Sequence, residues 1–449
     1  MSKNVQSKDE VSVLKRKLND SVIQNIIQLL NANTRNVMNK CYKCIRKSNG
    51  NRKTPNTISK DEFNSKIPLI SAVITTANKI ECDSLNYVVS KQDSGEVKKI
   101  ENGLDIFGGC SLNPEVYLIK LQSHYFLHLR AQETGSNTPG GSTDLIRLVF
   151  SIPNLIPSYV ISFGICYGIH PQKQKIGDVI IPEKLYPWSI GQKIGDDDWS
   201  IKDDNFNLWL ADKCSNKKMY ADIKDFCNGT DGKSFELTID CLYDKECLTR
   251  ESYQVTYGNM NTGEAVVSSK AAKKRIESAT KIMDGLAGEM EGYGIAKECI
   301  YYSNIPFFII KAICDWGDKK NMEQMLINYY EQGKNIKEKS NNKFPSEIKD
   351  LLPKKPIPRH LKDQLQAYAA FCAADSLIKL LDEKRECFMT FEFFKKLQKE
   401  GLTIISKMKL IDEIQHFYPQ SEPNSIFRSL VDAEFIVPVG TLDQFRIVK

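Results

Sequence analysis

Three carboxylates stand where an apolar stretch of the sequence meets a turn, and each could take part in acid–base chemistry. Glu81 follows an apolar run, Glu291 lies in Gly-Glu-Met-Glu-Gly, and Asp315 ends the run Lys-Ala-Ile-Cys-Asp. A charge at the end of a buried strand is costly unless it is paired or used. Each acid alone could equally be a helix cap or an ion-pair partner. Together with the glycine-bearing turns around them, the three acids predict one site.

Other residue types capable of chemistry form weaker patterns. Cys41 and Cys44 make a single C-x-x-C pair without the second pair typical of a zinc site. His124 and His128 lie four residues apart in a stretch typical of a strand, and we expect both to be structural histidines. The sequence contains no P-loop and no G-x-G-x-x-G that opens a helix. We therefore expect no metal and no cofactor.

The elements that must position these acids alternate between strands and helices. The predicted strands cover 68–75, 115–121, 125–130, 159–163, 178–182 and 306–313. The predicted helices cover 142–150, 269–282, 293–302 and 362–381. Such alternation is typical of an α/β sheet that helices cover on both faces. In open α/β sheets, ligands bind at the carboxyl ends of the strands, where several of the glycine-bearing turns fall.

The chain divides into three predicted parts: a basic helical arm with a linker at 1–66, an α/β body at 67–382, and a small module at 383–449. Apolar residues recur every three or four positions over 11–30, which predicts a helix in the arm. The last part has the order helix, helix, helix and β-hairpin, which is compatible with a winged helix. A protein-interaction module of another kind is the alternative.

The composition limits the class of protein. Of 449 residues, 41% are hydrophobic and 26% are charged, the balance of a chain that buries a core. No apolar run approaches the roughly 20 residues that span a bilayer, and no signal-peptide pattern is present, so we expect a cytoplasmic protein with no membrane contact.

The formal net charge of +6 is unevenly distributed. Residues 1–66 hold 14 Lys/Arg and five acids, or +9, whereas the remaining residues hold 48 basic and 51 acidic groups, or −3. The net charge therefore does not indicate that the whole protein binds nucleic acid, and a protein or nucleic-acid partner is an option for the basic arm or the C-terminal module.

Four blocks of the body resemble the nucleoside phosphorylase superfamily, in particular its 5′-methylthioadenosine/S-adenosylhomocysteine nucleosidase branch. The blocks are Ala-Val-Ile-Thr-Thr-Ala-Asn-Lys-Ile-Glu81, Val160-Ile-Ser-Phe-Gly-Ile-Cys-Tyr-Gly with Ile176-Gly-Asp-Val, Thr262-Gly-Glu-Ala-Val-Val, and Glu289-Met-Glu-Gly with Lys311-Ala-Ile-Cys-Asp. The resemblance covers about 67–318 and the helix near 364–381. It implies a three-layer αβα sandwich with a central mixed sheet, beside the helical arm and the winged-helix-like module.

The resemblance implies roles for four residues. Glu81 matches the general base that deprotonates the attacking water, and Asp315 matches the acid that donates a proton or hydrogen bond to N7 of a purine. Glu291 matches the carboxylate that binds the ribose hydroxyls, and Met290 matches the residue packed beneath the sugar. Two carboxylates held apart across a substrate suit glycoside hydrolysis with water as the nucleophile. Asp315 would then need to carry or share a proton.

Four further residues match the substrate pocket of that family. They are Val266 and Val267, which match the base pocket, and Gly164 and Ile165, which match the glycine turn. Phosphorylases of the superfamily carry an arginine before this turn, where this chain has Ser162, and a phosphate-binding serine in place of Ile165. An isoleucine side chain cannot bind phosphate, so the resemblance implies water as the nucleophile.

The substrate is expected to be a purine nucleotide or nucleoside. The run Gly-Ile-Cys-Tyr-Gly at 164–168 looks more like nucleosidase modules of bacterial defence and signalling proteins, which implies an adenine nucleotide such as ATP and an antiviral role. The glycine-rich stretch 135–142 opens a predicted helix, whose backbone N–H groups could receive a phosphate. An ordinary strand-to-helix loop is the alternative.

Two other functions stay open from the sequence: a phosphate-dependent purine nucleoside phosphorylase, and a nucleotide-sensing regulator that binds DNA through its tail and arm. The superfamily resemblance also implies at least a homodimer.

Overall fold

The computed structural model describes most of the chain. The described residues are 32–50, 56–101, 105–107, 114–122, 124–135, 139–170, 173–188, 192–194, 199–201, 208–209, 217–239, 249–263, 267, 272–276, 285–302, 305–317, 359–419 and 421–448. The helix predicted for 11–30 lies outside these ranges, as does most of the helix predicted for 269–282.

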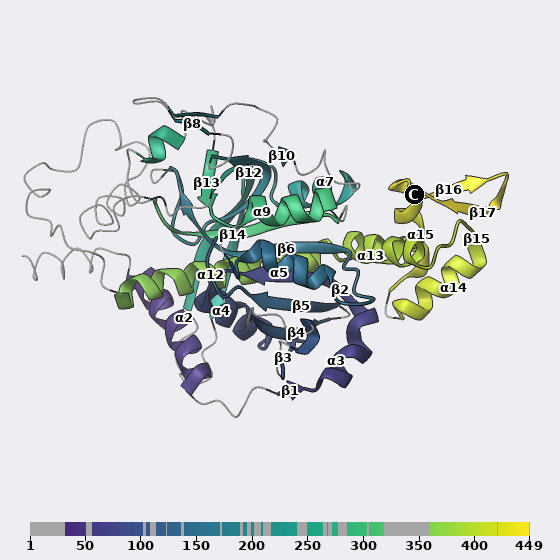
Figure 1. The fold of residues 1–449 in the computed structure, drawn as a ribbon, viewed down its shortest axis with the longest axis horizontal. Coiled ribbons are helices and arrows are strands. Elements are labelled where there is room, and N and C mark those ends of the chain that lie inside the picture. The colour runs from purple at the N-terminus through teal and green to yellow at the C-terminus, as the bar shows by residue number, and fades with distance from the viewer. Residues whose placement is uncertain are drawn as a thin grey trace, which may run out of the picture.

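A mixed β-sheet forms the centre of the body (Figure 1). Its strands are β1 (Thr57–Ile58), β2 (Ile70–Thr76), β3 (Glu96–Ile100), β4 (Glu115–Leu121), β5 (His124–Arg130), β6 (Tyr159–Gly168), β7 (Val179–Pro187), β10 (Leu208–Trp209), β11 (Lys233–Ile239), β12 (Thr249–Thr262), β13 (Gly285–Glu289) and β14 (Phe307–Asp315). Strand β2 runs parallel to β5 and β6, and β14 runs parallel to β6, whereas β13 is antiparallel to β6. The predicted α/β fold with a mixed sheet is confirmed.

Helices pack against this sheet in two groups. One group is α2 (Ala32–Gly50), α4 (Lys79–Val89) and α12 (Arg359–Glu383), and the other is α5 (Ser142–Phe150) and α9 (Gly292–Lys297) with the π-helical turn η4 (Glu298–Tyr302). Helix α12 runs the length of the body toward the C-terminal module (Figure 1). Shorter helices are α3 (Lys60–Lys66), η1 (Ile67–Leu69), η2 (Asp105–Phe107) and α7 (Lys217–Phe226). A separate two-stranded ribbon pairs β8 (Gln192–Ile194) with β9 (Trp199–Ile201).

The strand that ends in Asp315, β14, and its neighbour β6 are buried on both faces. In β14, every residue from Phe307 to Cys314 is buried, and in β6 only Ile165 and Tyr167 are partly exposed. Central strands covered by helices on both faces read as continuous apolar runs. This is why the predictions placed them well, although β6 and β7 extend five residues beyond the predicted ends.

The C-terminal module has the order of elements of a winged helix. It contains α13 (Arg385–Lys399), β15 (Ile404–Ser406), α14 (Lys407–Phe417), α15 (Pro423–Asp432), β16 (Ile436–Val439) and β17 (Thr441–Ile447), with the antiparallel sheet order β15-β17-β16. The three helices and the closing hairpin agree with the sequence prediction, which lacked only the short strand β15. Figure 1 shows the module at one end of the molecule.

A buried polar cluster joins this module to the body. The carboxylate of Glu392 in α13 accepts hydrogen bonds from the Tyr159 hydroxyl of β6 at 3.1 Å and from the Tyr418 hydroxyl at 3.4 Å. Its oxygen also lies 2.9 Å from Nδ1 of His124. His128 is buried too and lies 2.9 Å from the side-chain oxygen of Asn86. Both histidines are therefore structural, as the sequence analysis expected.

Helix α2 packs on the body through its apolar face. Cys41 and Cys44 are both buried on that face together with Val37 and Ile45. The C-x-x-C spacing thus places two thiols on one side of a helix, in the core. In the part of the chain that the structure describes, no helix is long and apolar enough to cross a membrane.

Candidate active site

Glu81 is fixed by the first turn of α4. Asn78 caps this helix, its side chain accepting a hydrogen bond from the Glu81 backbone at 3.1 Å, while Oε2 of Glu81 accepts from the backbone N–H of Asn78 at 3.1 Å. The two bonds form a capping box, which satisfies backbone donors that a helix start leaves without partners. Oε2 also accepts from the N–H of Ala77 at 2.8 Å, and Oε1 accepts from that of Ile165 at 3.1 Å.

Burial and charge act on Glu81 in opposite directions. Its side chain is 2% exposed, and burial raises the pKa of this carboxyl to about 7, with the nearby carboxylate of Glu291 adding to the rise. The ammonium of Lys311 and the N–H donors of Ala77 and Ile165 lower the pKa and limit the shift. A carboxyl with a pKa near neutrality can take up and release a proton at physiological pH.

Gly164 and Ile165 shape the β6 side of the site. A Cβ atom at Gly164 would lie 2.5 Å from Oε1 of Glu81, so only glycine leaves room for the carboxylate. Ile165 uses its backbone N–H to hold Glu81, and its side chain is half-buried. In the sheet register, Gly164 pairs with Lys311 of β14, which brings the lysine close to Glu81.

A buried ion network holds Glu291. Lys311 is 1% exposed, and its Nζ lies 2.5 Å from Oε2 of Glu291 and 3.0 Å from Oε2 of Glu289. Burial disfavours the ammonium form, but the carboxylates of Glu291, Glu289 and Glu81 together raise the pKa of Lys311 above its usual range. The lysine is therefore charged, and it faces the carboxylates from the middle of an otherwise apolar strand.

Backbone donors complete this network. Oε2 of Glu289 accepts from the N–H groups of Glu291 and Gly292, both at 2.8 Å, at the start of α9. Oε1 of Glu291 accepts from the N–H of Gly135 at 3.2 Å. The glycine-rich stretch 135–142 thus contributes its first residue to positioning Glu291, and α5 begins at Ser142 as predicted.

Asp315 ends β14 at the same edge of the sheet. Its Oδ1 accepts a hydrogen bond from the backbone N–H of Gly317 at 2.9 Å, and the side chain is half-buried. In the register, Asp315 pairs with Tyr167 of β6, and Gly288 of β13 pairs with the same tyrosine from the other side. A Cβ atom at Gly288 would lie 2.1 Å from the Tyr167 ring, so the glycine makes room for this aromatic side chain.

One cavity of about 750 Å³ connects these groups. Its lining includes Glu81, Ile165, Val267, Met290, Glu291 and Asp315, and so contains six of the eight predicted site residues. Gly164 is buried directly behind Glu81. Val266 lies outside the described residues. A volume of this size is typical of a small-molecule site.

The sequence analysis assigned no role to two residues of this site, Glu289 and Lys311. The position of Lys311 in the sequence does give a signal, because a lysine within the apolar run 307–314 is stable in a buried strand only if it finds buried partners. The partners themselves lie about 20 residues earlier in the chain and reach the lysine only through the fold.

Replacement of Lys311 by methionine should strongly destabilise the protein. The change leaves the buried carboxylates of Glu289 and Glu291 without their counter-charge, and removal of one partner of a buried ion pair costs about 3–5 kcal/mol. Denaturant unfolding measures this loss. Lys297→Met is the matched control, since Lys297 is exposed on α9 and should change the free energy of unfolding by no more than about 0.5 kcal/mol. Equal stability of the two variants would contradict the network.

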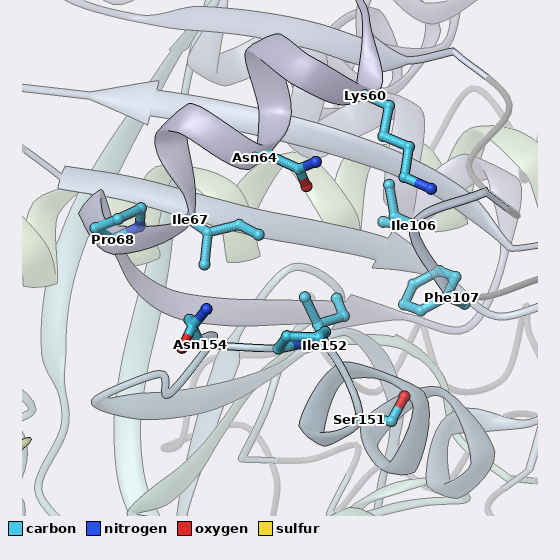
Figure 2. Close-up of a pocket in the computed structure, with 10 residues that line it drawn as sticks. Lys60, Asn64, Ile67, Pro68, Ile106, Phe107, Ser151, Ile152 and Asn154 are labelled. Atoms are coloured by element: carbon cyan, nitrogen blue, oxygen red, sulfur yellow. The ribbon is translucent and has the colours of Figure 1, made fainter.

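A second cavity, of about 610 Å³, lies elsewhere in the body between α3, η2 and the segment after α5 (Figure 2). Ile67, Ile106, Phe107 and Ile152 line it together with Lys60 and the polar side chains of Asn64, Ser151 and Asn154. Its described lining contains no Asp, Glu, His or Cys, and so offers no general acid–base pair. Within the described residues, no group of His, Cys, Asp and Glu side chains is arranged to hold a metal ion.

A death domain-containing ATP nucleosidase of Amphimedon queenslandica is 27% identical to the chain over 235 residues. The chain is similar in sequence to a nucleosidase. This relative confirms the likeness to nucleosidases that the four sequence blocks indicate. The match covers 51% of this chain and 39% of the relative, so the chain spans about two fifths of that protein's length. No family model matches the chain.

Solved structures give matches of low identity. The 5′-methylthioadenosine/S-adenosylhomocysteine nucleosidase of Helicobacter pylori is 14% identical, with 70% of this chain and 99% of that chain covered and a TM-score of 0.43. The corresponding nucleosidase of Colwellia psychrerythraea, in complex with adenine, is 13% identical, with 70% and 95% covered and a TM-score of 0.44.

Proposed function

We propose that the protein is a purine nucleosidase that hydrolyses the N-ribosidic bond of an adenine nucleotide or nucleoside. The observation that carries this proposal is the meeting of Glu81, Glu291 and Asp315 in one cavity, although they come from three separate segments of the chain. The sequence likeness to an ATP nucleosidase supports the same reaction class.

In the proposed reaction, Glu81 acts as the general base and Asp315 as the general acid. Glu81 accepts a proton from water as the water oxygen bonds to C1′ of the ribose. Asp315 donates a proton or a hydrogen bond to the departing purine as the bond from C1′ to the purine nitrogen breaks. Glu291 binds the ribose hydroxyls, and Met290 packs beneath the sugar. The products are the free base and a sugar with a hydroxyl at C1′.

Water is the favoured nucleophile over phosphate. A phosphate co-substrate needs cationic or hydroxyl partners beside the glycine turn. Here the side chain that follows Gly164 is Ile165, and its backbone N–H is already used by Glu81. The position before the turn holds Ser162, which is buried in β6. These residues support hydrolysis, and a phosphorylase remains the second enzymatic candidate.

The C-terminal module supports a partner-binding role more than a role in DNA binding. Residues 383–449 contain ten Lys/Arg and ten Asp/Glu, so their formal net charge is zero, whereas DNA-binding surfaces are strongly basic. The module also carries large apolar side chains that reach solvent, including Ile404, Met408 and Phe417, of which Met408 is 76% exposed. A neutral surface with apolar side chains suits a protein partner.

The proposed biological role is depletion of a nucleotide pool in antiviral defence. The support is the sequence likeness to a death domain-containing ATP nucleosidase. In this chain, the arm and the module are the segments that would gate the activity or choose the partner.

A product analysis tests the proposal. The full chain is incubated with ATP, ADP, AMP, adenosine, methylthioadenosine and the corresponding guanine compounds, with and without phosphate. We expect free adenine in phosphate-free buffer, with the ribose or ribose phosphate as second product. Strict dependence on phosphate, with a 1-phosphorylated sugar as product, would instead support the phosphorylase. Release of no base from any compound, together with specific DNA binding, would support the regulator.

A further inference from the structure

The lining of the active-site cavity contains both negative and positive side chains. Its carboxylates come from the first turn of α4 (Glu81), from the end of β13 and the start of α9 (Glu289 and Glu291) and from the end of β14 (Asp315). The lining also includes three cations, one acid and one amide from α4 and α12. These residues are Lys79, Arg359, Lys362, Asp363 and Gln366.

Four of these residues occupy one face of α12. Positions 359, 362, 363 and 366 follow the spacing i, i+3, i+4 and i+7, which brings side chains to one side of a helix. The first part of α12 therefore presents Arg359 and Lys362 side by side to the cavity. Like charges at such spacing repel each other, so this face is more stable when an anion lies between them.

The two cations are available for such an anion. Arg359 and Lys362 are exposed, and neither forms an ion pair or a hydrogen bond with another residue that the structure describes. Asp363 on the same face receives a hydrogen bond from Tyr42 of α2 at 3.5 Å. Lys79 pairs with Asp83 at 3.2 Å, but its side chain is 52% exposed and remains accessible from the cavity.

We infer that Arg359 and Lys362, with Lys79 nearby, form a subsite for the 5′-phosphate groups of the substrate. This inference rests on the proposed function, which places the sugar between Glu291 and Glu81 and the base at Asp315. The group attached to C5′ then lies in the same cavity as Lys79, Arg359 and Lys362, the cations of its lining. Arginine and lysine bind phosphate oxygens through charge-assisted hydrogen bonds, and Arg359 can donate two at once.

The subsite gives the enzyme a way to select nucleotides. A free nucleoside carries no anionic group that Arg359 and Lys362 could bind. A nucleoside 5′-phosphate supplies that negative charge. Because binding at a group remote from the reaction can be used to stabilise the transition state, the phosphates should raise kcat/KM for nucleotides above that for adenosine.

The test compares ATP, AMP and adenosine in the native protein, in Arg359→Met, in Lys362→Met and in the double variant. Loss of a hydrogen bond to a charged group reduces binding by about tenfold or more. We therefore expect kcat/KM for ATP to fall about tenfold in each single variant and more in the double variant, with kcat/KM for adenosine unchanged. Lys297→Met, outside the cavity, is the control.

A binding measurement separates failure of this inference from failure of the proposed function. Equilibrium binding of ATP and adenosine is measured with Glu81→Gln protein, with and without the two α12 substitutions. We expect the substitutions to weaken binding of ATP alone, and salt to weaken it as well. If the native protein releases no base but the substitutions still weaken ATP binding selectively, the subsite stands and the proposed reaction fails.

Two results would overturn the subsite. One is an equal effect of the substitutions on ATP and on adenosine, or no effect on either. The other is cleavage of adenosine that requires inorganic phosphate and is lost in the double variant, since the two cations would then bind the co-substrate and not the 5′-phosphates.

Discussion

Replacement of Glu81 by glutamine should lower the rate of base release by about 10²–10⁴-fold, the usual contribution of general acid–base catalysis. Glutamine keeps the length of the side chain. Its single amide oxygen can still accept hydrogen bonds either from the backbone N–H groups of Ala77 and Asn78 or from that of Ile165. It cannot accept a proton from water. The loss should therefore appear in kcat, measured as adenine released over time from the best substrate of the panel.

The matched control is Glu298→Gln. Glu298 is as buried as Glu81, at 4% exposed, and pairs with Arg147 at 2.6 Å, but it lies outside the cavity lining. We expect this variant to retain activity at temperatures at which it is folded. Activity of Glu81→Gln equal to that of the native protein would remove Glu81 from the proposed mechanism.

The pH profile gives Glu81 an independent signature. The carboxylate is the active form of a base, and burial raises its pKa to about 7. Below that pH an increasing fraction of Glu81 is protonated, so kcat/KM should fall about tenfold per pH unit on the acidic side and level off above neutrality. The residual activity of the Glu81→Gln protein should lack this dependence.

Replacement of Asp315 by asparagine should also reduce base release by about 10²–10⁴-fold, because an amide cannot protonate the departing purine. The amide oxygen can keep the hydrogen bond that Oδ1 accepts from Gly317, so the end of β14 should stay in place. The effect should be largest for substrates whose base is a poor leaving group. Rates are measured with adenosine and with a nucleoside that carries a more acidic base.

The control for this prediction is Asp432→Asn, which changes an exposed carboxylate of α15 in the C-terminal module. It should leave base release unchanged. If Asp315→Asn loses activity equally for good and poor leaving groups, Asp315 holds the substrate and is not the acid. If it loses none, the residue has no part in the reaction.

The strands of the body could be predicted because of their burial. The run of apolar residues in β14 and the similar run in β6 have no polar face, which is the pattern of central strands under helices. The long strand β12 was not predicted, since its polar residues and Gly258 interrupt any apolar run. Its place in the sheet depends on pairing with β7 and β13, which a local pattern does not contain.

The helix that carries Glu81 shows a signal that the sequence analysis did not use. Asn78 and Glu81 have the spacing of a capping box, which marks the start of a helix. With that signal, Glu81 is expected in the third position of a helix whose start follows the carboxyl end of β2, close to where the structure places it. Its raised pKa could not be predicted in this way, because it depends on burial and on Glu291, far along the chain.

The catalytic candidates were found through their resemblance to a family, whereas their supporting residues needed the fold. Lys311 is paired by β13 and the start of α9, and Arg359 reaches the cavity because α12 packs across α4 and β14. Such contacts join residues that are about 20 to 280 positions apart in the sequence. The spacing of residues within a single helix or strand does not predict these long-range contacts.

An isotope-labelling experiment shows directly whether the cavity that holds Glu81, Glu291 and Asp315 hydrolyses an N-ribosidic bond with water. The full chain and its Glu81→Gln variant are incubated with ATP in phosphate-free buffer containing ¹⁸O-labelled water, and the products are analysed by mass spectrometry. We expect free adenine from the native protein, one ¹⁸O atom in the sugar product, and a rate lower by at least about 10²-fold in the variant. Adenine release that is equal in both proteins, or no release from ATP or any nucleoside of the panel, would contradict it.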